Sequence, residues 1–147
     1  ALLFAAARVQ HIKNRILPAI NDGNIVFCDR YVDSTTAYQG YARGLGAEEV
    51  ERLNALAVGD VKIDLTIFLD FPPEKAFARK GGRDTGDRLE NEKMEFHKRV
   101  YEGFCKIAEK EPCRVVRLDA SGAKEQTHEK IVKLLIERGI IPSENNA

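Results

Sequence analysis

Asp29 and Arg30 are adjacent residues whose side chains suit a metal ion and a phosphate group. They follow an apolar run at 25–28, whose β-branched and aromatic residues predict a buried strand over 25–29. Ligands of open parallel α/β sheets bind beyond the carboxyl ends of the strands. There a carboxylate can hold Mg²⁺, directly or through water, and a guanidinium can bind a phosphate with its planar donors. A salt bridge at the strand end explains the two residues alone equally well.

Phe4 and Arg8 lie four residues apart in a segment with helical periodicity, so their side chains share a helix face. One interpretation is a core phenylalanine beside a solvated arginine. The other is a base-binding pair, in which Phe4 stacks on a flat ring and Arg8 donates to a carbonyl on its edge. Stacking of a base on an aromatic side chain contributes roughly 1–3 kcal/mol.

Residues 79–88 combine three glycines with four basic residues and contain no apolar anchor. The basic side chains include Arg79, Arg83 and Arg88. Such a segment cannot bury itself, so we expect a mobile surface loop. The loop is either an ordinary solvated connection or a lid whose arginines close over phosphates.

The elements that must position these residues alternate along the chain. Strands are predicted at 25–29, 64–70 and 114–119, and helices at 1–22, 34–41, 47–58, 74–80, 91–110 and 126–138. This alternation is typical of an α/β fold with a parallel sheet. Pro18 predicts a kink or break in the first helix. The expected apolar stripe of the first helix contains Leu3, Ala7, Ile12, Ile16, Leu17 and Ile20. The expected apolar face of the helix at 47–58 contains Leu53, Leu56 and Ala57.

The composition excludes several classes of protein. The chain of 147 residues has 23 basic and 23 acidic side chains, so no overall field attracts nucleic acid or a membrane surface. There is no run of 18 apolar residues. Three cysteines without metal-type spacing favour a reduced, cytoplasmic protein. We expect a single domain at 1–141 and a disordered tail at 142–147.

Five sequence blocks support a more specific interpretation. They are LFAAARVQH at 3–11, CDRY at 28–31 with Ser34 and AYQG at 37–40, RGL at 43–45, DLT at 64–66 with LD at 69–70, and DRLE at 87–90. In this order and spacing they resemble thymidylate kinase, the bacterial type of nucleoside monophosphate kinase, over residues 2–135. The resemblance implies a P-loop-type α/β kinase fold, a parallel sheet with flanking helices.

The resemblance also implies roles for single residues. Phe4 would stack on thymine and Arg8 would donate to a thymine carbonyl. Thr35 and Gln39, with Ser34 beside them, occupy positions where the family contacts the polar edge of the base. Tyr38 occupies the position that crowds the 2′ carbon of the sugar and favours deoxyribose.

The phosphate-binding roles follow in the same way. Arg30 would hold the monophosphate near the transferred phosphoryl group, and Asp29 would fix Mg²⁺ through water. The catalytic arginine of the lid, expected at 79–90, would be one of Arg79, Arg83 and Arg88. The implied reaction converts dTMP and ATP to dTDP and ADP, and the family is usually a homodimer to which the first helix contributes.

One departure from the family is large. The chain has no Gly-x-x-x-x-Gly-Lys-Ser/Thr loop to cradle the donor phosphates. We therefore expect the N-terminal strands of the fold to be missing, which leaves a gap between the segment at 25–29 and the strand near 65–70. The chain would be an incomplete copy of the kinase. The alternatives are an inactive fragment or module that retains dTMP binding or dimerisation, and a kinase for another nucleotide.

Overall fold

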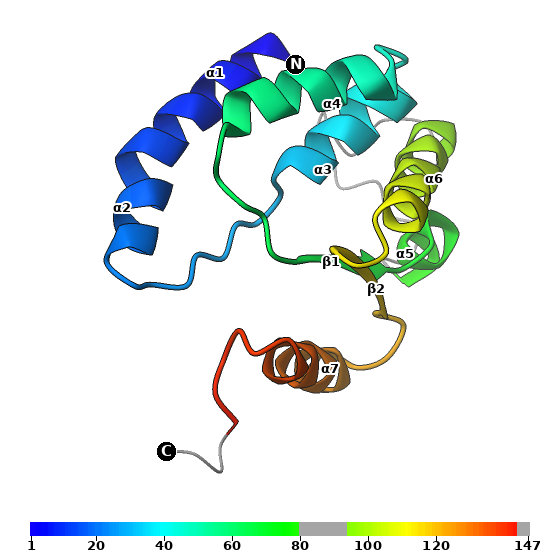
Figure 1. The fold of residues 1–147 in the computed structure, drawn as a ribbon. Helices are drawn as coiled ribbons and strands as arrows, with labels where there is room; N and C mark the ends of the chain where they lie inside the picture. The colour runs from blue at the N-terminus through cyan, green and yellow to red at the C-terminus, as the bar shows by residue number, and fades with distance from the viewer. Residues whose placement is uncertain (80–93, 144–147) are drawn as a thin grey trace.

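The computed structural model describes residues 1–79 and 94–143. Figure 1 shows the order of the elements, with helices gathered above a small sheet and one helix below it. The elements are α1 (Leu2–His11), η1 (Ile12–Ile16), α2 (Leu17–Asn21), α3 (Val32–Thr35), η2 (Thr36–Ala42), α4 (Ala47–Val58), β1 (Thr66–Asp70), α5 (Pro73–Arg79), α6 (Met94–Lys110), β2 (Val115–Asp119) and α7 (Lys124–Glu137).

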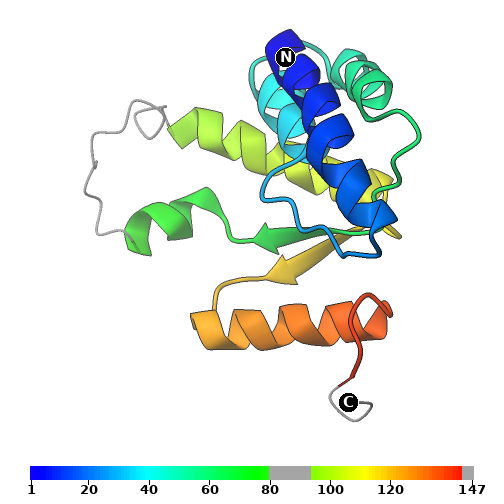
Figure 2. The ribbon, with the colours of Figure 1, turned by 90° about the vertical axis from the view of Figure 1, so that its left-hand side faces the viewer.

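The sheet of the described residues consists of two parallel strands, β1 and β2, in a register that pairs Thr66 with Val115 and Asp70 with Asp119. Helix α7 lies against one face of the sheet and α6 against the other (Figure 2). Because the strands are parallel, the two aspartates meet at the same edge. The predicted α/β architecture with flanking helices is confirmed, as are the strands near 64–70 and 114–119.

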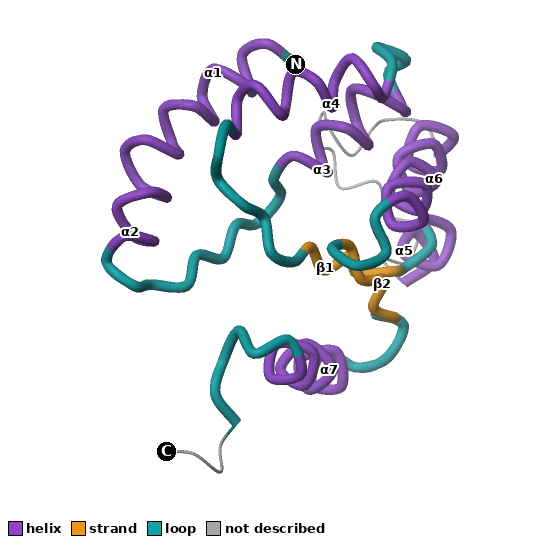
Figure 3. Tube along the Cα trace, in the orientation of Figure 1, coloured by secondary structure: helices purple, strands orange, loops and turns teal. Residues whose placement is uncertain are grey.

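The predicted strand at 25–29 is wrong. These residues form an exposed loop between α2 and α3 (Figure 3), and Ile25 and Phe27 are 51% and 67% exposed. An extended segment becomes a strand only when a neighbour satisfies its backbone donors and acceptors. In the described part of the chain no strand pairs with this segment, and β1 has a strand partner only in β2.

The first helical region continues through Pro18 instead of breaking. The helix widens into the π-helical turn η1, which ends at Ile16, and Pro18 follows in the first turn of α2. A proline has no N–H for the i−4 carbonyl, and a π-helical turn accommodates that loss. The buried residues of this region are Ala5, Arg8, Ile12 and Ile16. The predicted stripe is therefore wrong at four of its positions, which are exposed: Leu3, Ala7, Leu17 and Ile20.

The hydrophobic core forms where α6 packs against η2 and the sheet. Its buried members are Ala37, Ala42, Phe68, Phe96, Val100, Ile107, Ala108 and Val115. Gly40 of η2 permits a close approach to α4, because a Cβ at this position would lie 3.0 Å from the Ala47 Cα. Helix α4 in turn lies beside α1 (Figure 1), so the core connects the first helix to the sheet.

Some predictions fall on residues that the structure does not describe. The predicted lid lies outside the described residues from 80 onward, and with it Arg83 and Arg88. The predicted tail lies outside them from 144 onward. Within the described residues, no helix combines the length and apolar character needed to cross a bilayer.

Candidate functional site

Arg8 lies at the meeting point of α1, α3 and α4. Its Nη1 donates to Asn54 Oδ1 at 2.7 Å, and its Nη2 donates to Thr35 Oγ1 at 2.8 Å. Its guanidinium carbon lies 5.0 Å from the centre of the Tyr31 ring, a cation–π distance. The Arg8 residue is only 9% exposed. Three helices thus hold one buried guanidinium between neutral partners.

The charge of Arg8 has no carboxylate partner among the described residues. Burial lowers the pKa of this guanidinium below its ordinary value, and Tyr31 and Cys28 partly oppose that shift. An arginine remains charged even so. Of its five N–H groups, two donate to side chains in the described part of the chain, so donors remain for a ligand. Such a desolvated cation suits an electron-rich acceptor, for example a carbonyl on a base edge.

The Tyr31 hydroxyl is a second polar group of this cluster. It is buried and has no hydrogen-bond partner among the described residues. Burial raises the pKa of this hydroxyl and of the Cys28 thiol, while the Arg8 charge acts in the opposite direction on both. Because buried polar groups normally have partners, the hydroxyl is a site where water or a ligand can form a hydrogen bond.

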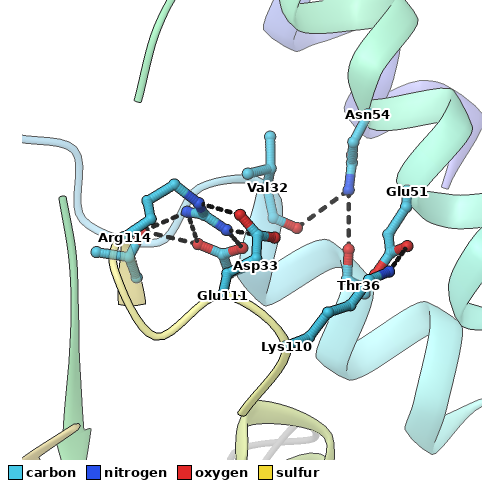
Figure 4. A network of polar contacts seen from close by, with 9 residues as sticks. Val32, Asp33, Thr36, Glu51, Asn54, Lys110, Glu111 and Arg114 are labelled. Atoms are coloured by element: carbon cyan, nitrogen blue, oxygen red, sulfur yellow. Dashed lines mark hydrogen bonds and ion pairs between the residues drawn. The ribbon is translucent and has the colours of Figure 1, made fainter. Parts of the chain in front are cut away.

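Asn54 is the site residue that sequence reasoning missed. Its Nδ2 donates to the Val32 carbonyl and to Thr36 Oγ1, both at 3.1 Å (Figure 4). The buried face of α4 is Val50, Asn54 and Ala57, so the predicted apolar face is wrong at Leu56, which is 83% exposed. Val50, Asn54 and Ala57 are spaced by four and three residues, and this helical spacing is the sequence feature that could have placed Asn54 on the buried face.

Arg30 and Tyr38 form the second part of the site. The Arg30 guanidinium carbon lies 4.5 Å from the centre of the Tyr38 ring. Tyr38 in turn packs edge-on against Phe96, with ring centres 6.0 Å apart. Arg30 has a φ of 62°, and no other non-glycine residue in the described ranges has a positive φ. Residues held in this region are strained and cluster at functional sites, so the turn at Asp29-Arg30 is a specific feature.

A network of charged residues connects Asp33, near the start of α3, to the two strands. Arg114 donates to both carboxylate oxygens of Asp33, at 2.7 and 2.8 Å, and also to Glu111 (Figure 4). Thr66 Oγ1 donates to Asp33 as well, at 2.7 Å. Hydrogen bonds from Arg114 to Asp33 and Glu111 raise the pKa of Arg114, while burial opposes the shift. The network joins α3 to the beginning of both strands.

The structure brings together some of the residues predicted from the sequence. Arg8 contacts Thr35, and Arg30 contacts Tyr38. Phe4 is 58% exposed and lies one turn before Arg8 on α1. Ser34 and Gln39 are half-buried in the same helical region as Thr35, and Asp29 is exposed beside Arg30.

Arg79 is not brought to this cluster. It is the last residue of α5, and its guanidinium carbon lies 5.9 Å from the centre of the Phe71 ring. Helix α5 lies away from α1 in both Figure 1 and Figure 2.

The described residues could hold Mg²⁺ only together with water and substrate phosphates as further ligands. Within residues 1–79 and 94–143, no three His, Cys, Asp or Glu side chains gather as a metal cage. The exposed Asp29 carboxylate nevertheless fits a magnesium site, because Mg²⁺ is usually bound by one or two carboxylates together with water and substrate phosphates.

Comparison with known proteins identifies similar chains. The model of the family described as thymidylate kinase matches residues 1–131. Thymidylate kinase from Synechococcus sp. (strain JA-2-3B'a(2-13)) is 51% identical over 122 residues, which cover 83% of this chain and 58% of the relative. Thymidylate kinase from Thermoanaerobacter sp. (strain X514) is 44% identical over 134 residues, which cover 91% of this chain and 66% of the relative.

A solved structure agrees with these matches. Thymidylate kinase from Ehrlichia chaffeensis superposes with a TM-score of 0.69 at 33% identity, covering 91% of this chain and 62% of that one. The chain therefore spans about three fifths of the length of the relatives it matches.

Proposed function

The chain belongs to the thymidylate kinase family, and we propose that the protein that carries it phosphorylates dTMP to dTDP with ATP and Mg²⁺. One observation carries the proposal: Arg8 is a buried guanidinium without a carboxylate partner in the described ranges, held by Asn54 and Thr35. A cation desolvated in this way is best stabilised by an acceptor that arrives with the ligand.

Thymine recognition uses the first helix and the segment that follows Asp29. Arg8 donates to a carbonyl of the base, and the exposed ring of Phe4, one turn earlier, stacks on its face. Thr35, with Ser34 and Gln39 from the same region, supplies polar contacts to the base edge. Stacking recognises any base, whereas the directed hydrogen bonds distinguish thymine from bases with a different pattern of donors and acceptors.

Arg30 and Tyr38 then serve the sugar and the phosphate. The Tyr38 ring, held between Arg30 and Phe96, crowds the 2′ position and favours deoxyribose. The Arg30 guanidinium binds the monophosphate of dTMP, the group whose oxygen attacks ATP. Phosphoryl transfer depends mainly on positioning and on neutralisation of phosphate charge, so no covalent nucleophile is required from the chain.

The remaining roles concern the donor side of the reaction. Asp29 holds Mg²⁺ through water, and the metal ion neutralises charge on the phosphate oxygens when bound. One of Arg79, Arg83 and Arg88 acts as the lid arginine. The 147 residues contain no Gly-x-x-x-x-Gly-Lys-Ser/Thr sequence to bind the donor phosphates. Their part in the reaction is therefore to bind the acceptor and to neutralise phosphate charge.

We also propose a cytoplasmic homodimer. Free thiols at Cys28, Cys105 and Cys113 fit a reducing compartment. Exposed apolar residues on α1 and α2 support a subunit interface there: Leu2, Leu3, Val9, Leu17 and Ile20. Sedimentation of the Val9→Glu variant tests the interface, and His11→Glu, at an exposed position on another face of the same helix, is the control. A monomeric unsubstituted protein would contradict it.

Direct binding of dTMP tests the function. We expect the Arg8→Ala variant to lose about 1.5–3 kcal/mol of dTMP binding free energy, the range for a hydrogen bond to a charged group. Arg15→Ala is the matched control, because Arg15 is an exposed arginine of the same helical region. Equal dTMP affinity in all three proteins would overturn the base-binding role of Arg8.

Turnover is measured separately as dTDP formation from dTMP, ATP and Mg²⁺. Binding of dTMP without turnover would instead favour the alternative of an inactive module that retains the acceptor pocket. Comparable turnover of dCMP would favour a kinase for another nucleotide.

A further inference from the structure

We propose that Asn54 is a positioning residue that orients the Arg8 guanidinium for recognition of the base. The inference rests on the proposed function and extends it from residues that touch the nucleotide to one that acts through Arg8. It is carried by a closed set of hydrogen bonds between three helices.

The orientation of the Asn54 amide follows from the chemistry of its neighbours. A guanidinium has only donors, so the group facing Arg8 Nη1 at 2.7 Å must be the Asn54 oxygen. The amide nitrogen then faces the Val32 carbonyl and Thr36 Oγ1, both at 3.1 Å, and donates one hydrogen to each. Both N–H groups and the oxygen of Asn54 therefore have partners, and the side chain has one well-defined orientation.

These bonds form a closed circuit. Arg8 donates to Asn54 and to Thr35. Asn54 is anchored to Val32 and Thr36, which flank Thr35 on α3 and η2. The guanidinium plane is thus fixed at two nitrogens by groups whose own spacing is fixed. The directions of its remaining N–H groups are set before a ligand arrives, which reduces the ordering cost of binding.

The neutral character of Asn54 is part of this arrangement. Asn54 is 5% exposed and lies on the buried face of α4 with Val50 and Ala57. An aspartate there would place a carboxylate oxygen against the Val32 carbonyl and would neutralise Arg8. The amide instead holds the guanidinium by a hydrogen bond and leaves its positive charge for the ligand.

A double-mutant cycle on dTMP affinity tests the inference. The proteins are the unsubstituted full protein and its Asn54→Ala, Arg8→Ala and doubly substituted variants, titrated with dTMP by calorimetry. We expect Asn54→Ala to weaken dTMP binding by roughly tenfold when Arg8 is present, with the KM for ATP unchanged. In the Arg8→Ala background we expect the same substitution to change the affinity by less than about twofold.

A matched control separates positioning from a general loss of structure. Val50→Ala removes a buried side chain from the same face of α4, and Val50 takes part in none of the circuit's hydrogen bonds, so we expect lower stability with unchanged dTMP affinity. If Asn54→Ala does not fold, Asn54→Ser is used in the same cycle with the same expectation.

The two ways of failing are distinct. Equal weakening by Asn54→Ala in both Arg8 backgrounds, with dTMP bound by the unsubstituted protein, would overturn this inference alone. No dTMP binding by the unsubstituted protein would overturn the proposed function, and this inference with it.

Discussion

Arg114 holds Asp33 with two hydrogen bonds that span 81 residues of sequence. Nη2 donates to Oδ1 at 2.7 Å and Nη1 donates to Oδ2 at 2.8 Å, a planar two-point contact. Asp33 lies in α3 directly before Ser34 and Thr35, and Arg114 directly precedes β2. The pair therefore ties to the sheet the helix that carries Ser34 and Thr35, the residues proposed to contact the base.

We expect Asp33→Asn to lower the free energy of unfolding by about 2–3 kcal/mol. The two side chains are only 19% and 11% exposed, and removal of one partner from a mostly buried pair leaves the other charge poorly compensated. The loss is smaller than for an isolated pair because Arg114 keeps Glu111. Urea unfolding provides the measurement.

The exposed pair Lys110–Glu51 is the control for that experiment. Its nitrogen and oxygen lie 2.6 Å apart, but the side chains are 56% and 29% exposed. Lys110→Ala should therefore cost less than about 1 kcal/mol. Similar losses for the two variants would contradict a special role for the Arg114–Asp33 pair.

Tyr101 predicts a loss of stability at alkaline pH. Its hydroxyl donates to Asp70 Oδ1 at 2.7 Å. This hydrogen bond, helped by burial, raises the pKa of Tyr101 to about 12 from an ordinary value of 10. Because the folded protein binds this proton more tightly than the unfolded chain, the stabilisation is complete below pH 10 and is lost as the pH rises from 10 to 12.

The measurement is urea unfolding across that pH window. In the Tyr101→Phe variant the part of the pH dependence that comes from this residue should disappear, and stability should already be lower at neutral pH. An identical slope in both proteins would show that the Tyr101–Asp70 hydrogen bond does not form in solution.

The positive φ of Arg30 predicts an unusual order of stability between two variants. At most positions glycine is less stable than alanine, because it loses more conformational freedom on folding. At a φ of 62° alanine carries the strain of its Cβ and glycine does not, so Arg30→Gly should be more stable than Arg30→Ala by about 1 kcal/mol. Both variants lack the guanidinium, which makes the comparison matched. A more stable alanine variant would rule out this backbone conformation.

Gly40 predicts a steric cost at the contact between η2 and α4. The added methyl group of Gly40→Ala would lie 3.0 Å from the Ala47 Cα and 3.3 Å from the Gly46 carbonyl oxygen. Backbone atoms cannot rotate away, so α4 must shift, at a cost of about 1–3 kcal/mol. Thermal or urea unfolding measures the loss, and Leu56→Ala, at an 83% exposed position of α4, should change stability by less than about 0.5 kcal/mol. A neutral Gly40→Ala would mean that η2 and α4 lie farther apart.

Local features of the sequence predicted the elements well where one short segment contains the whole signal. The helix expected at 47–58 has those bounds in α4. The strands near 64–70 and 114–119 are present because each has the other as a neighbour. The run at 25–29 has an equally strong strand composition, yet it is a loop, since no strand of the described residues satisfies its backbone. Composition describes a tendency, and the hydrogen-bonding partner decides the outcome.

The sequence by itself determined the family, the α/β class and the identities of the side chains at the proposed acceptor site, because residue types and their spacing are local properties. Only the tertiary structure decided that Arg8 faces inward and that Asn54, 46 residues away, holds it. It also decided that Asp33 pairs with Arg114. These partners come from different helices and from the start of a strand, and their contacts depend on how the elements pack together.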